Sequence, residues 1–264
     1  MRWIALFLLW PVAAIAAATG ADVVFLGEVH DNPAHHIAQA AEIERMQPAA
    51  VVFEMLTDEQ AARVSPQLLP DREALQAKLE WDASGWPDFA IYYAIFAALG
   101  EARVYGAAVS RQKAREASAD VIGAFGPDAP RFGLDRPLPE DQQAAREAAQ
   151  MSAHCDALPS EMLPMMVAIQ RLRDARLAQV ALQALEDTGG PVAVVTGNGH
   201  ARKDWGAPAL LSLAAPDVTV WALGQGEGDD PPLGEFDALR SAPAPEREDP
   251  CAAFAKQPDA VSTD

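Results

Sequence analysis

The chain has few of the residues and motifs that mark common enzyme classes. Its 264 residues include only 2 cysteines, Cys155 and Cys251, and their separation is far too wide for a zinc knuckle. There is no G-x-S-x-G sequence, no P-loop and no well-placed glycine-rich dinucleotide fingerprint, so serine hydrolases and nucleotide-binding proteins lose most of their support. Cations are also scarce, since 20 lysines and arginines stand against 38 acidic residues. The formal net charge of −18 argues against nucleic acid and anionic membranes as partners.

The N-terminal segment has the composition of a secretory signal peptide. Arg2 precedes an apolar stretch over residues 3–15, and Ala14, Ala16 and Ala18 offer small-residue cleavage sites. This stretch is too short to predict a membrane span, and no cysteine near it offers a site for lipid attachment. We therefore expect residues 1–18 to be removed and the mature protein to be soluble, with no transmembrane span, in a bacterial periplasm or secreted. In that oxidising compartment, Cys155 and Cys251 are expected to form one disulfide.

Apolar runs of strand length alternate with helical patterns along the rest of the chain. Strands are expected at residues 22–26, 50–53, 102–109, 192–196 and 218–223. Helices are expected at residues 33–46, 71–80, 89–99, 111–125 and 208–214, with a further short helix capped by Thr57. This alternation predicts an α/β fold with a mostly parallel central sheet and helices on both faces. Residues 19–264 are expected to form one domain, with a helical insertion at about 137–188 and an irregular tail at 224–264.

The same motif follows two of the expected strands. Each strand runs into glycine, two further residues and histidine, at Gly27–His30 and again at Gly197–His200. Glycine lets the chain turn sharply at such a point. A third apolar run, at residues 50–53, ends at Glu54. Because ligands bind beyond the carboxyl ends of the strands in an open α/β sheet, we expect one cavity to gather Glu28, His30, Glu54 and His200.

The residue types of this cluster fit more than one chemistry. Imidazole nitrogen and carboxylate oxygen suit zinc, manganese or iron, so His30, Glu54 and His200 are candidate ligands of a divalent metal. Together with Glu28, the same groups could supply the general base and orienting acid of a hydrolase. Asn198 could hold a substrate oxygen or a propionate, or could equally be a turn residue. Tyr92 is a candidate haem-iron ligand, although a tyrosine on a buried helix face is more often part of the core.

The ordered set of motifs resembles the ChaN-like haem-binding uptake family of the Tiki superfamily. The resemblance extends over nearly the whole mature chain, and the residues that carry it are Gly27–Pro33 with His35 and His36, Phe53–Met55, Gly85–Pro87 with Tyr92, Ile95 and Phe96, His154 with Cys155, Gly197–His200, and Asp249–Cys251. The wider superfamily shares the doubled histidine motif and a glutamate. It also includes metal-dependent peptidases and erythromycin-esterase-like hydrolases.

This resemblance implies an exported protein that binds haem at a homodimer interface for haem or iron uptake, with the uptake machinery as a further partner. A tyrosine would ligate the iron, for which Tyr92 matches best, and a histidine of the partner subunit would contact the propionates. The candidate cofactor contacts are Tyr92, His30, His36, Asn198 and His200. A second function stays open, namely a peptidase or esterase, with or without a metal, that uses Glu28, His30, Glu54 and His200.

Overall fold

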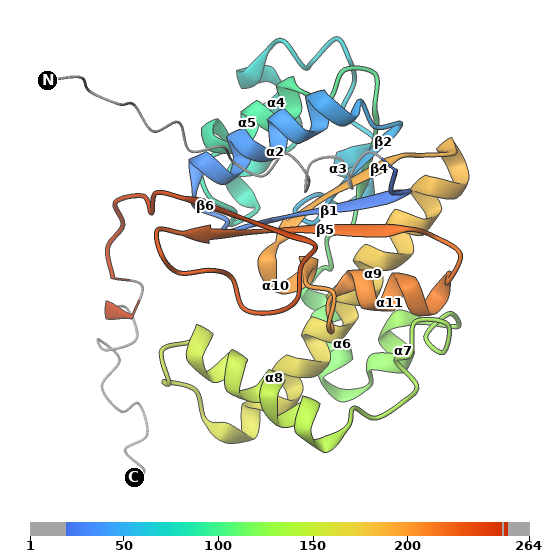
Figure 1. Ribbon diagram of the computed structural model, residues 1–264, viewed down its shortest axis with the longest axis vertical. Coiled ribbons are helices and arrows are strands. Elements are labelled where there is room, and N and C mark those ends of the chain that lie inside the picture. Colours follow the sequence, from blue (N-terminus) through green and yellow to red (C-terminus); the bar gives the residue numbers. More distant parts are fainter. Residues whose placement is uncertain (1–19, 250, 253–264) are drawn as a thin grey trace, which may run out of the picture.

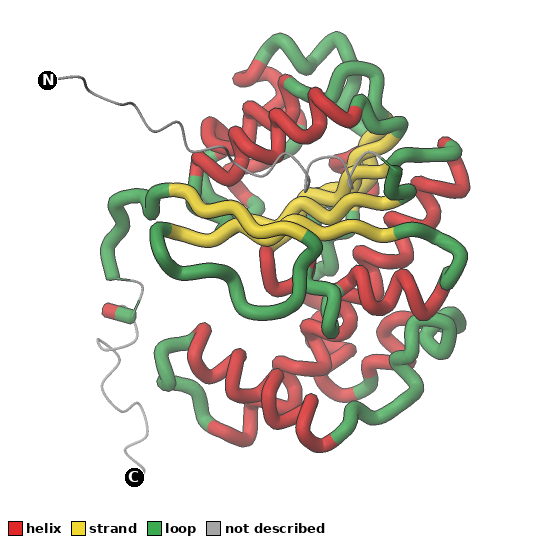
Figure 2. Tube along the Cα trace, viewed as in Figure 1, coloured by secondary structure: helices red, strands yellow, loops and turns green. Residues whose placement is uncertain are grey.

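A central six-stranded parallel sheet carries helices on both faces (Figures 1 and 2). The computed structural model describes residues 20–249 and 251–252, so the predicted signal peptide lies outside the described residues. The strand order is β3-β2-β4-β1-β5-β6. The strands are β1 (Val23–Glu28), β2 (Ala50–Phe53), β3 (Arg103–Gly106), β4 (Val192–Gly197), β5 (Val220–Glu227) and β6 (Ala238–Ala242). This architecture confirms the predicted α/β fold.

The alternation of side chains along the buried strands divides the core into two layers. In β1, Val24 and Leu26 face one layer, whereas Val23 and Phe25 face the other. Because β1, β2 and β4 are covered on both faces, their sequences are continuous apolar runs without polar alternation. The three strands end side by side at one edge of the sheet, where Glu28 pairs with Gly197 and Phe53 with Val195.

The helices divide between the two faces of the sheet, as Figure 1 shows. One face carries α2 (Pro33–Met46), α3 (Asp58–Ala61), α4 (Arg72–Lys78), a 3₁₀ turn η1 (Trp81–Ala83) and α5 (Phe89–Ala97). On the other side lie α6 (Arg111–Ala119), α7 (Val121–Phe125), α8 (Glu140–Ala153), a 3₁₀ turn η2 (Ser160–Met162), α9 (Leu163–Thr188), α10 (Asn198–Ala201) and α11 (Ala207–Ala214). The long helix α9 packs against the sheet, and α6, α7 and α8 pack against α9.

Local sequence signals explain several helix boundaries. The Asn32 side chain accepts from the Ala34 backbone N–H and caps α2. Thr57 and Gln60 form the capping box of α3. The helix predicted over residues 111–125 is instead two helices, because Asp120 has extended backbone and its side chain caps α7.

The predicted irregular tail is wrong for its first part. β5 continues to Glu227, and β6 adds a sixth strand at the edge of the sheet, paired in parallel with β5. The β6 sequence, Ala-Leu-Arg-Ser-Ala, has little apolar surface, and its residues are only half-buried or exposed. Such an edge strand is held chiefly by backbone hydrogen bonds, to which its side chains give little clue. The strand expected over residues 102–109 is also shorter, at Arg103–Gly106.

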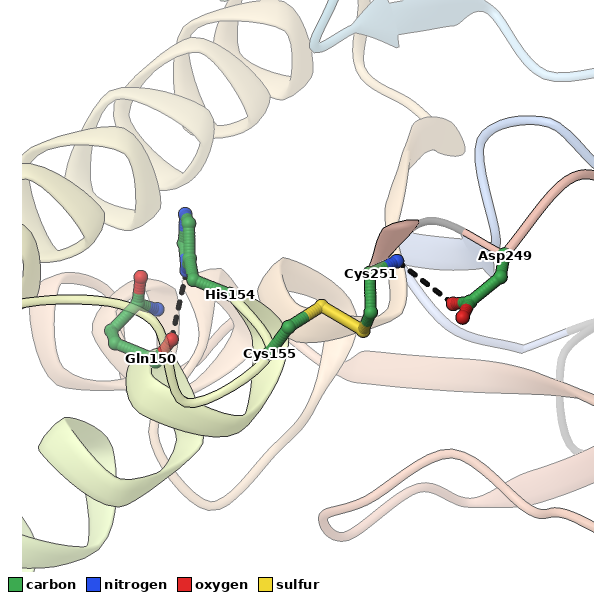
Figure 3. Close-up of a disulfide and its surroundings, with 5 residues drawn as sticks. All are labelled: Gln150, His154, Cys155, Asp249 and Cys251. Atoms are coloured by element: carbon green, nitrogen blue, oxygen red, sulfur yellow. Dashed lines mark hydrogen bonds between the residues drawn. A yellow bond between two sulfur atoms is a disulfide. The ribbon is translucent and has the colours of Figure 1, made fainter. Parts of the chain in front are cut away.

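The C-terminal segment is fastened to the body of the protein at two points. Cys155 and Cys251 form the predicted disulfide, with their Cα atoms 5.5 Å apart, between the turn after α8 and the tail (Figure 3). Arg247 forms ion pairs with Glu227 at the end of β5 and with Asp31 in the turn after β1. Within the described residues, none of the helices combines the length and the apolar character that a membrane crossing requires.

Candidate functional site

The order of the strands opens a crevice at the carboxyl edge of the sheet. β4 lies between β1 and β2. The chain leaves β1 and β2 toward the face that carries α2 and α5, but leaves β4 toward the face that carries α9 and α11. Ligands of open α/β sheets bind where successive connections diverge in this way. Both glycine-histidine motifs and Glu54 lie at this position.

Two neighbouring cavities occupy the crevice. The larger cavity, of about 860 Å³, is lined by His30, Glu54 and His200 together with side chains from α3, α9 and the loops after β2 and β3. The smaller cavity, of about 420 Å³, lies between the strand ends and the helices α8 and α9. His30, Gln170 and His200 line both cavities. The prediction that His30, Glu54 and His200 meet in one cavity is therefore confirmed, whereas Glu28 lines the smaller cavity and not the larger one.

Glu28 holds the His30 ring in place, and the lack of a side chain at Gly197 leaves room for that ring. Its Nδ1 lies 2.8 Å from Glu28 Oε1, and its ring packs edge-on against Trp86 at 4.8 Å between centroids. A Cβ at position 197 would lie 2.9 Å from His30 Cε1, which is too close for a real contact. Gly197 itself has φ −62° and ψ 151°, which any residue adopts. The glycine is therefore needed for close approach, and not for the sharp turn that the sequence suggested.

Glu28 and His30 form an ion pair at neutral pH. Burial by itself would raise the pKa of Glu28, but the imidazoles of His30 and His36 hold it far below its usual range. Burial would lower the pKa of His30, whereas the hydrogen bond to Glu28 and the charge of Glu54 raise it to about 9. The His30 side chain is 38% exposed, so this cation is accessible from the cavity.

His200 lies between two carboxylates. Its Nδ1 is 2.6 Å from Asp174 Oδ1, and its Nε2 is 3.6 Å from Glu54 Oε1. The other oxygen of Glu54 accepts from Thr196 Oγ1 at 2.6 Å and from the Gly197 N–H at 2.9 Å. Burial alone would lower the pKa of His200, but Glu54 and Asp174 raise it. Burial raises the pKa of Asp174, while the nearby imidazoles and hydrogen bonds lower that of Glu54 despite its burial.

Tyr92 and His36 form a buried layer beneath Glu28. The Tyr92 hydroxyl donates to Glu28 Oε1 at 3.0 Å and to the His30 carbonyl at 3.1 Å, and burial raises the pKa of the phenol. The His36 ring stacks on Tyr92 at 4.0 Å, and its Nε2 lies 3.5 Å from Glu28 Oε2. Both side chains have 0% exposure and line neither of the two cavities. A ligand in either cavity could contact Tyr92 or His36 only after the side chains that cover them had moved.

Asn198 has a structural role. Its side chain donates to the Gln225 carbonyl and accepts from the Gln225 N–H, at 2.8 and 2.9 Å. To reach β5, it passes over β1 at Gly27, where a Cβ would lie 2.5 Å from Asn198 Oδ1. The nitrogen and the oxygen of the Asn198 amide are therefore both bonded within the protein. This arrangement does not support the predicted contact of Asn198 with a cofactor. His35 is also structural, because it bonds the Val29 N–H and the Gly226 carbonyl.

The metal prediction for His30, Glu54 and His200 is not supported by the geometry. Within residues 20–249 and 251–252, no group of three His, Cys, Asp or Glu side chains is arranged to hold a metal ion. In the structure His30 pairs with Glu28, and His200 pairs with Asp174.

Sequence reasoning missed Asp174, which orients His200. A signal for it was present, because Asp174 is seven residues after Val167 and seven before Ala181, on the buried stripe of α9. A carboxylate at a buried position of a helix needs a charged partner, and here that partner is His200.

A family described as haem-binding uptake, Tiki superfamily, ChaN matches residues 14–211 of the sequence. The chain belongs to this ChaN family. Among solved structures, ChaN of Campylobacter jejuni, described as showing cofacial haem binding, is 19% identical, with a TM-score of 0.59. That match covers 83% of this chain and 88% of the other and shows a shared fold. The type III effector HopBA1 is a weaker likeness, with 13% identity, 87% and 92% coverage and a TM-score of 0.45. No curated protein matches the chain.

Proposed function

We propose that this protein is an exported haem-binding protein for haem or iron uptake, which holds haem between two protomers. Membership of the ChaN family supports haem as the ligand. The observation that carries the proposal for this chain is the accessible His30 imidazole at the wall of the larger cavity. The N-terminal composition supports export, as argued from the sequence.

The larger cavity has the residue types that haem requires. Trp86, Met55 and Leu177 give it apolar wall, which suits the porphyrin. Its lining also includes Arg63, Arg111 and Arg173, and guanidinium groups bind carboxylates such as propionates. The same lining also carries Glu54, Glu59 and Glu80, and Arg63 pairs with Glu80. Arg111 and Arg173 are therefore the candidate partners of the propionates.

His30 is better placed than Tyr92 to contact the iron. Its Nδ1 is bonded to Glu28, which leaves Nε2 for a ligand, and a histidine that binds metal commonly has its second nitrogen held by a carboxylate in this way. Tyr92 lies behind Glu28 and stabilises that carboxylate. Because the pKa of His30 is raised to about 9, binding of iron by its neutral imidazole displaces a proton.

Haemin titration of the mature protein tests this proposal. We expect saturable binding with a ferric visible spectrum, and loss of most affinity in His30→Ala. Affinity should increase as the pH rises toward about 9, because less work is then needed to deprotonate His30. Tyr92→Phe should keep the charge-transfer bands if His30 ligates the iron, and change them if Tyr92 leaves Glu28 to do so. Absence of saturable binding would refute the haem proposal, and sedimentation with and without haemin would test the homodimer.

The His200 arrangement favours a hydrolase as the second candidate function. A buried Asp174 holds one nitrogen of the His200 imidazole, as a carboxylate does for the histidine base of many hydrolases. The other nitrogen faces Glu54 across 3.6 Å. Ester and peptide substrates would test this function. Activity that is lost in both His200→Gln and Asp174→Asn, while the fold is retained, would support it. No turnover of either substrate class would argue against it.

A further inference from the structure

The C-terminal tail connects two sides of the smaller cavity. On one side is the turn after β1, where Val29 and His30 line the cavity. On the other side, α8 contributes Arg146, Ala149, Gln150 and Ala153 to the wall. From the end of β6, the tail runs along the side of the molecule toward the layer of α8 (Figure 1). It is attached at both of these places, so it spans the distance between the strand ends and α8.

The first attachment of the tail is a group of polar bonds at the turn after β1. The Asn32 side chain donates to the Pro243 carbonyl at 3.0 Å and to Glu227 Oε1 at 2.7 Å. Arg247 donates to Asp31 Oδ1 at 2.8 Å and to both carboxylate oxygens of Glu227 at 2.7 Å. These bonds fix residues 243–247 beside the turn that carries His30.

The second attachment is the disulfide between Cys251 and Cys155, just after α8. Beside it, the Cys251 N–H donates to Asp249 Oδ1 at 2.8 Å (Figure 3). A Schellman-type cap ends α8, in which the Asp156 N–H donates to the Met151 carbonyl at 3.0 Å. Cys155 has the left-handed position of this cap, with φ 61°, where glycine is usual because a side chain costs free energy. The bridge offsets this cost, and its loss removes that compensation from the end of α8.

α8 has few other attachments to the body of the protein. It packs mainly against α9, and Arg146 is the one buried residue among its 14 residues, all of which are described. Arg146 donates to the Trp205 carbonyl at 3.2 Å and lies 4.0 Å from Asp174. Tertiary packing supplies most of the stability of helices in proteins, so a helix with so little buried surface is easily displaced. Without the bridge, α8 can therefore move away from the strand ends.

We propose that residues 243–249 with Cys251 form a redox-sensitive strap, which holds α8 toward the strand ends and closes the smaller cavity. Both cysteines are half-buried, so a dithiol reductant can reach the bridge. One thiolate of the reductant attacks a sulfur of the bridge and releases the other cysteine, and its second thiolate then releases the first cysteine. Two electrons and two protons pass to the protein, which gains two thiols, while the reductant becomes a disulfide. Opening of the strap exposes His200, which lines this cavity and is only 8% exposed in the closed form.

Hydrogen exchange of the haem-free mature protein, in short labelling pulses with and without dithiothreitol, tests the proposal. Reduction should speed exchange in α8 at least roughly tenfold, whereas β1 and α5 should stay protected because the protein remains folded. The double variant Cys155→Ser, Cys251→Ser should exchange like the reduced protein and should not respond to dithiothreitol. Acrylamide should quench Trp205, which lines the smaller cavity, more strongly after reduction, with Trp205→Phe giving the contribution of the other tryptophans.

Arg247→Met tests the strap with the bridge intact. It removes the ion pairs at the turn after β1 and should speed exchange in α8 at least roughly threefold. Arg115→Met, at an exposed position of α6, should leave that exchange unchanged.

Three results would overturn the proposal. The first is exchange in α8 that does not respond to reduction or to Arg247→Met, and the second is quenching of Trp205 that does not change. The third is an equal loss of protection in α8 and β1, because the bridge would then act only on global stability. None of these measurements uses haem, so their failure is distinguishable from failure of the haem proposal.

Discussion

At the scale of single residues, two glycines shape the candidate site because they have no side chain. Gly197 leaves room for the His30 ring, and Gly27 leaves room for the Asn198 side chain to cross β1. Each glycine of the doubled motif therefore makes space for a residue of the neighbouring strand end. The two glycines therefore have matching roles, one toward His30 and the other toward Asn198.

Gly197→Ala should displace His30. The added Cβ would lie 2.9–3.0 Å from the ring atoms Cε1 and Nε2, so the ring must shift away from position 197 and disturb its contact with Glu28. We expect a loss of about 1–3 kcal/mol in unfolding free energy from overpacking, together with weaker haemin binding. Denaturant unfolding and haemin titration measure the two effects.

Gly199→Ala is the matched control. Position 199 lies in α10, two residues away, and a Cβ there meets nothing within 4 Å. This variant should bind haemin normally and be no less stable, since alanine is the better helix former. Equal effects of the two substitutions would contradict the close-approach argument.

The strand ends could be predicted from the sequence, but the pairing of groups within the site could not. His30, Glu54 and His200 each follow an apolar strand, so topology alone brings them to one cavity. Which carboxylate faces which imidazole depends on α9, because Asp174 reaches His200 from that helix. The burial of Tyr92 likewise depends on the packing of α5 against α2.

At the scale of secondary-structure elements, Asn198 links two strands that are not neighbours. β4 and β5 are separated by β1, and the Asn198 amide bonds both backbone groups of Gln225 across it. The Gln225 side chain in turn donates to the Gly27 and His35 carbonyls. These hydrogen bonds hold the ends of β4, β1 and β5 together at the carboxyl edge of the sheet.

Asn198→Ala should destabilise the fold without removing a ligand contact. It leaves the N–H and carbonyl of Gln225 unsatisfied, and Gln225 is only 1% exposed. We expect a loss of about 2 kcal/mol in unfolding free energy, with haemin affinity of the folded fraction unchanged. Gln112→Ala, which removes an exposed amide on α6, should change stability by less than about 0.5 kcal/mol. A large loss of haemin affinity in Asn198→Ala at retained stability would instead indicate a binding role.

Element boundaries were predictable where local chemistry sets them. Thr57 caps its helix as predicted, and Asn32 and Asp71 cap theirs in the same way. β6 could not be predicted in this way, since its main partner is the backbone of β5 and its side chains are at best half-buried. The break at Asp120 was missed because its side chain caps α7 while the apolar pattern continues across it.

At the scale of the whole molecule, the disulfide joins the tail to the helical layer. The bridge spans 96 residues, and in the chain-entropy treatment a loop of this length stabilises the folded state by about 4–5 kcal/mol. The double variant Cys155→Ser, Cys251→Ser should lose most of this free energy in denaturant unfolding. Reducing agent should lower the melting temperature of the wild-type protein and leave that of the double variant unchanged. A wild-type protein insensitive to reduction would contradict a stabilising role.

The disulfide also closes residues 155–251 into a covalent ring, and the residues before Cys155 form an arm outside this ring. The ring contains α9, β4, β5 and β6, and with them Asp174 and His200, whereas the arm contains β1, β2 and β3 with Glu28, His30 and Glu54. The two halves of the candidate site therefore differ in their resistance to cleavage. One protease cut within the ring leaves a single connected molecule until it is reduced, whereas one cut between β3 and Cys155 breaks the covalent link between the ring and a fragment that carries β1, β2 and β3.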